Sequence, residues 1–340
     1  MPAFLALSPA PAVFLRRGLP WLLGALALCS AMATAQPADT DADPKAWLQR
    51  MQLAARQSNY QGTLVTSSAG ALSSVKVAHY CVGDQTYERV EALDGQHQRL
   101  LRVNEAVHLL WPQQRVAVVE RRMPTSALPS SSHTIEPRAL EHYDMLREGL
   151  DRVAGREAQR FLLRPRDDLR YAQRLWADRA TGLMLRADIL GPQGQVLESS
   201  GFSDVEVGVR PQPEQVTQAL KKLDGYRVDR PEQRPVQLEA EGWQQDKTVP
   251  GFKLLGCVRR PLEMGGVADA VLQAVFSDGL THLSLFIEAA EPKRALLSQS
   301  LQIGATATLR QRRGDHWITV MGDAPLATLK ALADSVQRKR

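Results

Sequence analysis

Residues 60–121 alternate short β-rich runs with turn-forming pairs, and no other feature of the sequence constrains the fold as much. The candidate strands are 60–67, 73–82, 85–93, 97–103, 106–111 and 116–121. Gly83-Asp84 and Asp94-Gly95 separate some of these runs, and glycine accepts the positive φ that a tight hairpin turn requires. Because parallel neighbours would need long crossovers, connections this short predict an antiparallel meander.

The same pattern of short β-rich runs returns after residue 150 and extends the predicted sheet. The further candidate strands are 151–154, 157–164, 171–178, 183–190 and 195–207. Two helices accompany them: 44–58, with Asp43 as the cap and Pro44 at the first position, and 137–149, with Leu140, Tyr143, Met145 and Leu146 as its apolar members. A sheet of about eleven strands has to curl. Where a helix fills the concave side incompletely, an apolar pocket remains.

The pattern of short β-rich runs ends at residue 211, where a proline-rich stretch begins. We expect a linker over 211–242 that contains a short helix at 213–223. Beyond it, strands at 251–259, 270–277, 280–288, 305–312 and 316–321 precede a helix at 325–338. The predicted fold class is therefore α+β and mostly β. A large curled antiparallel half-barrel with helices (44–210) is followed by a smaller C-terminal α+β domain (243–338).

The N-terminal residues 1–35 have the pattern of a signal peptide. Arg16 and Arg17 precede an apolar run, 19–29, and small residues then recur at Ala31, Ala33 and Ala35. A membrane-spanning helix needs about 20 apolar residues, and this run is shorter. The alternative is a short buried helix. Leu28 stands where a lipoprotein signal requires a small residue, so we expect no lipid attachment and a periplasmic mature chain.

Two cysteines, Cys81 and Cys257, follow the predicted signal peptide. An oxidising compartment would allow them to pair. They fall in separate predicted domains, which favours two lone thiols, but the sequence alone leaves the pairing open.

Patterns that carry catalysis are missing from the sequence. There is no Gly-x-Ser-x-Gly elbow, no His-Glu-x-x-His pair, no phosphate-binding glycine loop and no dinucleotide fingerprint. Asp167 and Asp168 stand among arginines, which favours ion pairs over an acid/base couple. The net charge of +5 lacks a concentrated basic patch, so nucleic acid is not an expected partner. We expect no enzyme, no metal site and no cofactor.

Binding is the better-supported class of function. Large apolar residues lie near the loop at 122–136 and on the late strands, and methionine adapts its shape to loosely specified apolar ligands. The alternative for each of these residues is plain core packing.

Several short stretches in order resemble the RseB/MucB family of periplasmic sigma-E factor regulatory proteins. They are Asn59-Tyr-Gln-Gly-Thr-Leu-Val65, Arg152-Val-Ala-Gly-Arg156, Pro165-Arg-Asp-Asp-Leu-Arg-Tyr171, Leu175-Trp-Ala-Asp178, Thr181-Gly-Leu183, Phe276-Ser-Asp-Gly-Leu280, Ser284-Leu-Phe-Ile-Glu288 and His316-Trp-Ile-Thr-Val320. The similarity covers about residues 44–338.

The resemblance implies a fold and a function. The larger domain would be similar to the lipoprotein carriers LolA and LppX. The chain would bind the periplasmic part of a single-span anti-sigma factor (RseA or MucA) and protect it from regulated proteolysis, and lipid or lipopolysaccharide fragments would favour release. We place lipid contact on Trp111, Met123, Leu128, Met145, Trp176 and Met184. We place partner contact on Phe276, Asp278 and Phe286.

The alternative function is a periplasmic lipid or lipoprotein carrier, for which the first domain alone would suffice. The sequence identifies neither the lipid nor the bound segment of the partner, and it leaves a homo-oligomer open.

Overall fold

The computed structural model describes residues 43–121, 135–262, 269–290 and 299–339, and every structural statement below concerns these ranges. They contain two large, mostly antiparallel sheets, of twelve and seven strands, together with the helices that pack on them. Within these ranges no helix is long and apolar enough to cross a membrane.

Helix α1 (Pro44–Gln57) begins as the sequence predicts. The Asp43 side chain accepts a hydrogen bond from the backbone N–H of Lys45 at 2.9 Å, and Pro44 occupies the first turn, where no intrahelical donor is needed. One side of the helix buries Trp47, Leu48 and other apolar residues. This side packs on strands β2, β7 and β10 of the first sheet.

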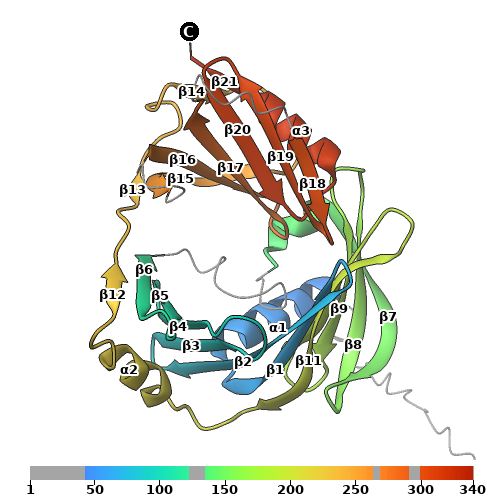
Figure 1. Ribbon diagram of the computed structural model, residues 1–340. Coiled ribbons are helices and arrows are strands. Elements are labelled where there is room, and N and C mark those ends of the chain that lie inside the picture. The colour runs from blue at the N-terminus through green and yellow to red at the C-terminus, as the bar shows by residue number, and fades with distance from the viewer. Residues whose placement is uncertain (1–42, 122–134, 263–268, 291–298, 340) are drawn as a thin grey trace, which may run out of the picture. The chain divides into compact units, whose positions relative to one another are not determined.

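The first sheet has the strand order β12-β6-β5-β4-β3-β2-β1-β11-β10-β9-β8-β7. Figure 1 shows it curving around α1. Its strands are β1 (Tyr60–Ser68), β2 (Ala71–Val82), β3 (Gln85–Ala92), β4 (Arg99–Val103), β5 (Ala106–Trp111), β6 (Val116–Arg121), β7 (Tyr143–Val153), β8 (Arg156–Pro165), β9 (Ala172–Asp178), β10 (Met184–Leu190), β11 (Val196–Val207) and β12 (Arg227–Asp229). The curled, mostly antiparallel architecture that the sequence predicts is confirmed.

The two faces of this sheet carry different helices. We call the face that packs on α1 the inner face; it holds Val77 of β2 and Leu175 of β9 in cores with α1 residues. The opposite, outer face carries α2 (Glu214–Lys221), where Val216 packs on Leu101 and Leu110. Because side chains alternate along a strand, successive residues within β4, and within β5, point to opposite faces of the sheet.

The second sheet has the order β13-β15-β16-β17-β20-β19-β18. Its strands are β13 (Arg234–Pro235), β15 (Lys253–Leu262), β16 (Asp269–Ser277), β17 (His282–Ala289), β18 (Gln299–Ile303), β19 (Thr306–Arg313) and β20 (His316–Gly322). Helix α3 (Leu326–Ser335) packs on β19 and β20 and buries Leu329 and Leu332 in the core of this sheet. Strands β14 (Trp243–Gln245) and β21 (Val336–Arg338) pair separately.

The predicted linker is structured and divides between the sheets. It contributes α2 and β12 to the first sheet, where β12 runs parallel to β6, and β13 to the second. The domain boundaries at 210 and 243 stay predictions.

One predicted helix is wrong. Residues 137–149 form a 3-10 helix, η3 (Pro137–Glu141), and then the start of β7. Tyr143 and Met145 are buried, while Asp144 between them is half-buried and Leu146 is exposed, so the burial follows the two-residue period of a strand. Pairing with β8 supplies the backbone hydrogen bonds, and Gly149 lies at a bulge instead of capping a helix.

A buried ion pair fixes the turn that joins β9 and β10. Asp178, whose side chain is 2% exposed, accepts hydrogen bonds from Arg156 at 2.9 and 3.0 Å and from the Thr181 hydroxyl at 2.6 Å. Burial by itself raises the pKa of Asp178, but these hydrogen bonds outweigh it and lower the pKa below its ordinary value of 3.8.

We therefore expect Asp178→Asn to reduce the free energy of unfolding at pH 7 by about 2 kcal/mol, because it leaves Arg156 without its anion. Since the pKa is depressed in the folded state, this contribution is complete above pH 3.8 and is lost as the pH falls below it. Urea unfolding at pH 7 and pH 3 measures both effects.

The matched control is Asp204→Asn, at an exposed position of β11. An equal loss in both variants, or a gap between wild type and Asp178→Asn that does not shrink in acid, contradicts the ion-pair account.

Candidate functional site

A strip of half-buried apolar side chains runs along the inner face of the first sheet, on strands β4, β5 and β6. The pairing places the strip on one face, because Leu100 opposes Leu109, Leu109 opposes Val118, and Trp111 opposes Val116. In Figure 1 these strands lie away from α1, which packs farther along the same curved sheet. The strip is therefore an apolar continuation of the inner face, which an acyl chain suits.

Charged side chains border this strip. The Glu88 carboxylate lies 3.2 Å from Arg102 Nη1 and 3.6 Å from His79 Nε2, and all three side chains are less than a tenth exposed. The Nδ1 of His79 is 2.9 Å from the Ser58 carbonyl, and the His79 ring stacks on Tyr60. Buried charges require such partners, so this cluster fixes the polar boundary of the apolar strip.

The structure separates the predicted lipid contacts. Trp111 lies on the apolar strip, whereas Met145 and Met184 pack with α1 and β9 residues in the core of the inner face. Trp176 lies on the outer face, because it alternates with Leu175 and Ala177 of that inner core. Met123 and Leu128 lie outside the described residues. The lipid-binding assignment stays a prediction, for which Trp111 is best placed.

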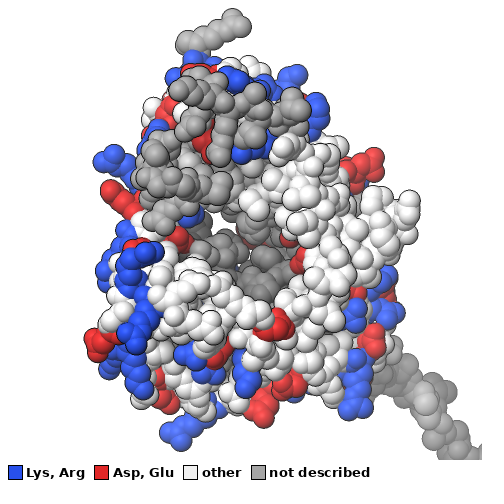
Figure 2. All heavy atoms as spheres, in the orientation of Figure 1, with Lys and Arg blue, Asp and Glu red and all other residues white. Residues whose placement is uncertain are grey.

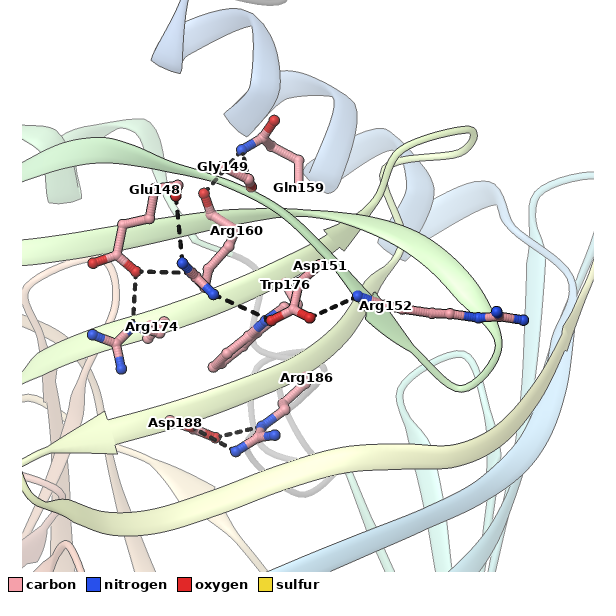
Figure 3. Close-up of polar contacts among 10 residues, drawn as sticks. All are labelled: Glu148, Gly149, Asp151, Arg152, Gln159, Arg160, Arg174, Trp176, Arg186 and Asp188. Atoms are coloured by element: carbon pink, nitrogen blue, oxygen red, sulfur yellow. Dashed lines mark hydrogen bonds and ion pairs between the residues drawn. The ribbon is translucent and has the colours of Figure 1, made fainter.

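Trp176 belongs to a network of charged residues on the outer face of β7–β10 (Figure 3). Its indole N–H donates to Asp151 at 3.0 Å, and the Arg186 guanidinium lies 4.6 Å from the ring centroid. Arg160 connects Asp151 with Glu148. The indole hydrogen bond leads the interactions that lower the pKa of Asp151. Trp176, which is 5% exposed, is thus covered by these polar side chains and by the hydrophobic cluster that it shares with Ala158 and Leu185.

The turn between β16 and β17 joins the second sheet to the first. The Gly279 carbonyl accepts from the Glu136 N–H at 2.8 Å, and Leu280 packs in the core that contains Trp47 and Ala139. Gly279 has φ +98°, and a Cβ there would lie 3.0 Å from the Ala139 nitrogen, so glycine allows the turn to approach η3 this closely.

A fully buried ion pair lies at this junction. Asp278 Oδ2 is 3.1 Å from Arg170 Nε, and both side chains have zero exposure. Arg170 also donates to Asp167 at 2.9 Å and to the Pro250 carbonyl at 2.6 Å. The Tyr143 hydroxyl donates to Asp278 at 3.2 Å, and burial raises the pKa of Tyr143 well above its ordinary range. The junction therefore holds five polar groups in one fixed arrangement.

The predicted partner contacts do not form a surface. Phe276 has zero exposure in the core of the second sheet, and Asp278 is enclosed in the junction. Phe286 is half-buried and opposes Gln273 and Thr319. If Asp278 influences a partner, it does so by holding the junction; the partner-binding assignment stays a prediction.

Three hairpins form an uncharged face, which is the broad white area in Figure 2. Their uncharged stretches are 65–75, 189–197 and 299–309. They meet where Ala305 packs with Ile189 and Leu197, and where a Cβ on Gly304 would lie 2.0 Å from Ser68 Oγ. The strongly exposed members are Leu72 (72%), Val196 (50%), Leu301 (60%) and Ile303 (55%). Exposed apolar patches of this kind are typical of interaction surfaces, and sequence reasoning missed this one because its residues lie far apart in the chain.

Cys81 and Cys257 are free thiols. Burial raises the pKa of Cys257 to about 11, which makes it unreactive at neutral pH. The described ranges hold no group of three or more His, Cys, Asp or Glu side chains suited to a metal ion.

The sequence matches two family models, the MucB/RseB N-terminal domain over residues 43–220 and the MucB/RseB C-terminal domain over 237–337. The chain belongs to the MucB/RseB family. It is 30% identical over 337 residues to the sigma factor AlgU regulatory protein MucB of Pseudomonas aeruginosa, covering 92% of this chain and 96% of that protein. It is 24% identical to the sigma-E factor regulatory protein RseB of Escherichia coli K12, covering 91% and 94%.

Solved structures of MucB show the same fold. The P. aeruginosa MucA/MucB complex matches with a TM-score of 0.66 and 27% identity, over 86% of this chain and 98% of that chain. MucB in complex with MucA(peri) matches with a TM-score of 0.65 and 28% identity, over 88% and 100%. These MucB/RseB relatives are named as regulatory and binding proteins, which agrees with a site built from apolar surfaces and structural ion pairs.

For this MucB/RseB chain we expect Asp278→Ala to reduce the free energy of unfolding by about 3–5 kcal/mol, because it leaves the buried Arg170 cation uncompensated. Equilibrium urea unfolding measures the loss. Hydrogen exchange should show faster opening at Glu136, whose N–H bonds to the same turn.

The control is Asp315→Ala in the turn between β19 and β20, where the carboxylate is 78% exposed and we expect a much smaller loss. Similar losses in both variants rule out a stabilising role for the Arg170–Asp278 pair.

Proposed function

We propose that this protein is a periplasmic negative regulator of an envelope-stress sigma factor that binds the periplasmic part of a MucA-like anti-sigma factor. One observation carries the proposal: the chain resembles MucB over both domain models and nearly its whole length, and MucB has been solved in complex with MucA(peri). A bound partner would be shielded from the protease that degrades it. The function is therefore binding and protection.

We place the partner contact on the uncharged face, at strand β18. This strand is the last of the second sheet and pairs only with β19 among the described strands, so its other edge has backbone groups available. All five of its residues are exposed, and Leu301 and Ile303 share one side. An extended peptide that adds to such an edge gains backbone hydrogen bonds and apolar contact together.

A lipid release signal is the finer part of the proposal. The apolar strip on the inner face favours an acyl ligand, and the same observation favours the second candidate function, a periplasmic lipid carrier. A ligand that binds the free form more tightly than the complex has to weaken the complex.

The test of the main proposal is titration calorimetry of the purified chain with the periplasmic segment of a MucA-like anti-sigma factor from the same organism. We expect a saturable 1:1 complex, and we expect the segment to resist proteolysis when bound. Absence of heat and of protection at micromolar concentrations refutes the proposal. Transfer of a bound acyl ligand to vesicles, without either effect, would support the carrier instead.

The double variant Leu301→Lys/Ile303→Lys should weaken the complex about tenfold or more, because two desolvated apolar contacts are replaced by charged groups. Its melting temperature should change little, since both side chains are already exposed. Titration calorimetry and thermal unfolding report the two quantities.

Leu326→Lys, at a 40% exposed position of α3, serves as the control and should bind normally. If the β18 variant binds as tightly as this control, the partner contacts another surface.

The apolar strip gives a separate expectation for tryptophan fluorescence. Dodecyl maltoside below its micellar concentration should change the emission of the wild-type protein, and Trp111→Phe should remove most of that change because Trp111 lies on the strip.

Trp176→Phe should keep the change, since that indole is already buried, with Asp151 at its N–H and Arg186 over its ring. The reverse pattern, or no response in the wild type, excludes acyl binding on the strip.

A further inference from the structure

We propose that the pocket beneath α2, on the outer face of the first sheet, binds a small amphiphilic anion. This site is distinct from the apolar strip, which lies on the opposite face, and it does not depend on the proposed partner. The pocket has a volume of about 280 Å³. It lies between α2 and the strands β3, β4 and β5, and residues just after α2 complete its wall.

The charged lining of the pocket is mostly basic. Arg89, Arg99 and Lys222 contribute three cations, and Glu91 is the single anion in the lining. Arg99 contacts Glu91 at 2.9 Å, and His97 also lies within 3.2 Å of the same carboxylate. Arg99 and, at longer range, Arg89 both act on the Glu91 carboxylate and lower its pKa, so three cations face one anion and the lining keeps an excess of positive charge.

Arg89 is the decisive residue. Its Nε is buried and has no hydrogen-bond partner in the part of the chain that the structure describes. A buried donor without an acceptor costs free energy, and a ligand anion in the pocket would remove that cost. A guanidinium group offers several donors in one plane, which matches the oxygens of a phosphate or carboxylate. Lys222, whose side chain is exposed at the pocket wall, adds a second positive charge.

The remaining lining gives the ligand an apolar part. Leu101 and Leu110 come from the sheet, Ala219 and Leu223 from α2 and the residues after it, and Tyr226 closes one side. The amide side chains of Gln215 and Gln218 add donors at the wall. Ligand pockets have volumes of about 300–1,000 Å³, so this one suits a single anionic group with a short apolar chain and excludes a full-length acyl lipid.

The experiment uses the full mature chain and titration calorimetry with two probes, octyl phosphate below its micellar concentration and inorganic phosphate. Octyl phosphate should bind 1:1 and raise the melting temperature, because a ligand of the native state stabilises it. Inorganic phosphate should bind more weakly, since it lacks the apolar part. Equal affinities for the two probes overturn the amphiphilic part of the proposal.

The site is assigned with a variant that removes two positive charges from the pocket and with two control variants outside it. Arg89→Gln/Lys222→Gln should weaken octyl phosphate binding by at least about tenfold, as expected when charge-assisted hydrogen bonds are lost. Lys247→Gln removes an exposed charge far along the chain, beyond the pocket lining, and should bind like wild type. Trp111→Phe should also bind like wild type, because the apolar strip is a different site.

Unchanged affinity in the double variant overturns the proposal, as does an equal loss in Lys247→Gln. Loss of binding in Trp111→Phe would indicate that octyl phosphate binds on the inner face, and it would also overturn the proposal. None of these outcomes bears on anti-sigma factor binding, which the calorimetric and protease tests above decide independently.

Discussion

The buried pair of Arg170 and Asp278 is the interaction on which the joining of the two sheets depends. Two opposite charges with zero exposure are tolerated only because every neighbouring polar group is engaged: Tyr143, Asp167, the Pro250 carbonyl and the backbone of the β16–β17 turn. Such a pair adds little net stability compared with apolar packing but specifies one geometry, since any displacement exposes a bare charge to an apolar interior.

The alternation of side chains along each strand then determines which residues lie on which face of the first sheet. Neighbouring residues of β9 face opposite ways, so Leu175 packs near α1 while Trp176 lies under ion pairs on the other side. The same rule puts Leu100 on the apolar strip and Leu101 on the floor of the pocket beneath α2. One sheet thereby has two chemically different faces, with an apolar strip on the inner face and a mostly basic pocket on the outer face.

Much of this fold could be predicted from local pattern. Turn pairs such as Gly83-Asp84 and Asp94-Gly95 marked hairpins correctly, and the Asp43-Pro44 pair marked the start of α1, because both signals act within a few residues. Residues 143–149 misled the prediction because their apolar spacing suits a helix, and only pairing with β8 makes them a strand. Strand β18 escaped notice because it is an edge strand with no buried residue. The candidate site was harder to predict. Trp111 is assigned to the apolar strip only by the strand register, and the ion-pair partner of Asp278 is Arg170, which lies more than a hundred positions away in the sequence.

The short path between the sheets limits how the protein can move. Only residues 230–233 separate β12, which is hydrogen-bonded to the first sheet, from β13, which is hydrogen-bonded to the second. A fully stretched chain from Asp229 to Arg234 reaches about 18 Å. Wide opening would therefore have to detach β12 from β6 or β13 from β15, strands of three and two residues. The pairing of these two small strands, more than the bending of a hinge, restricts how far the two sheets can separate.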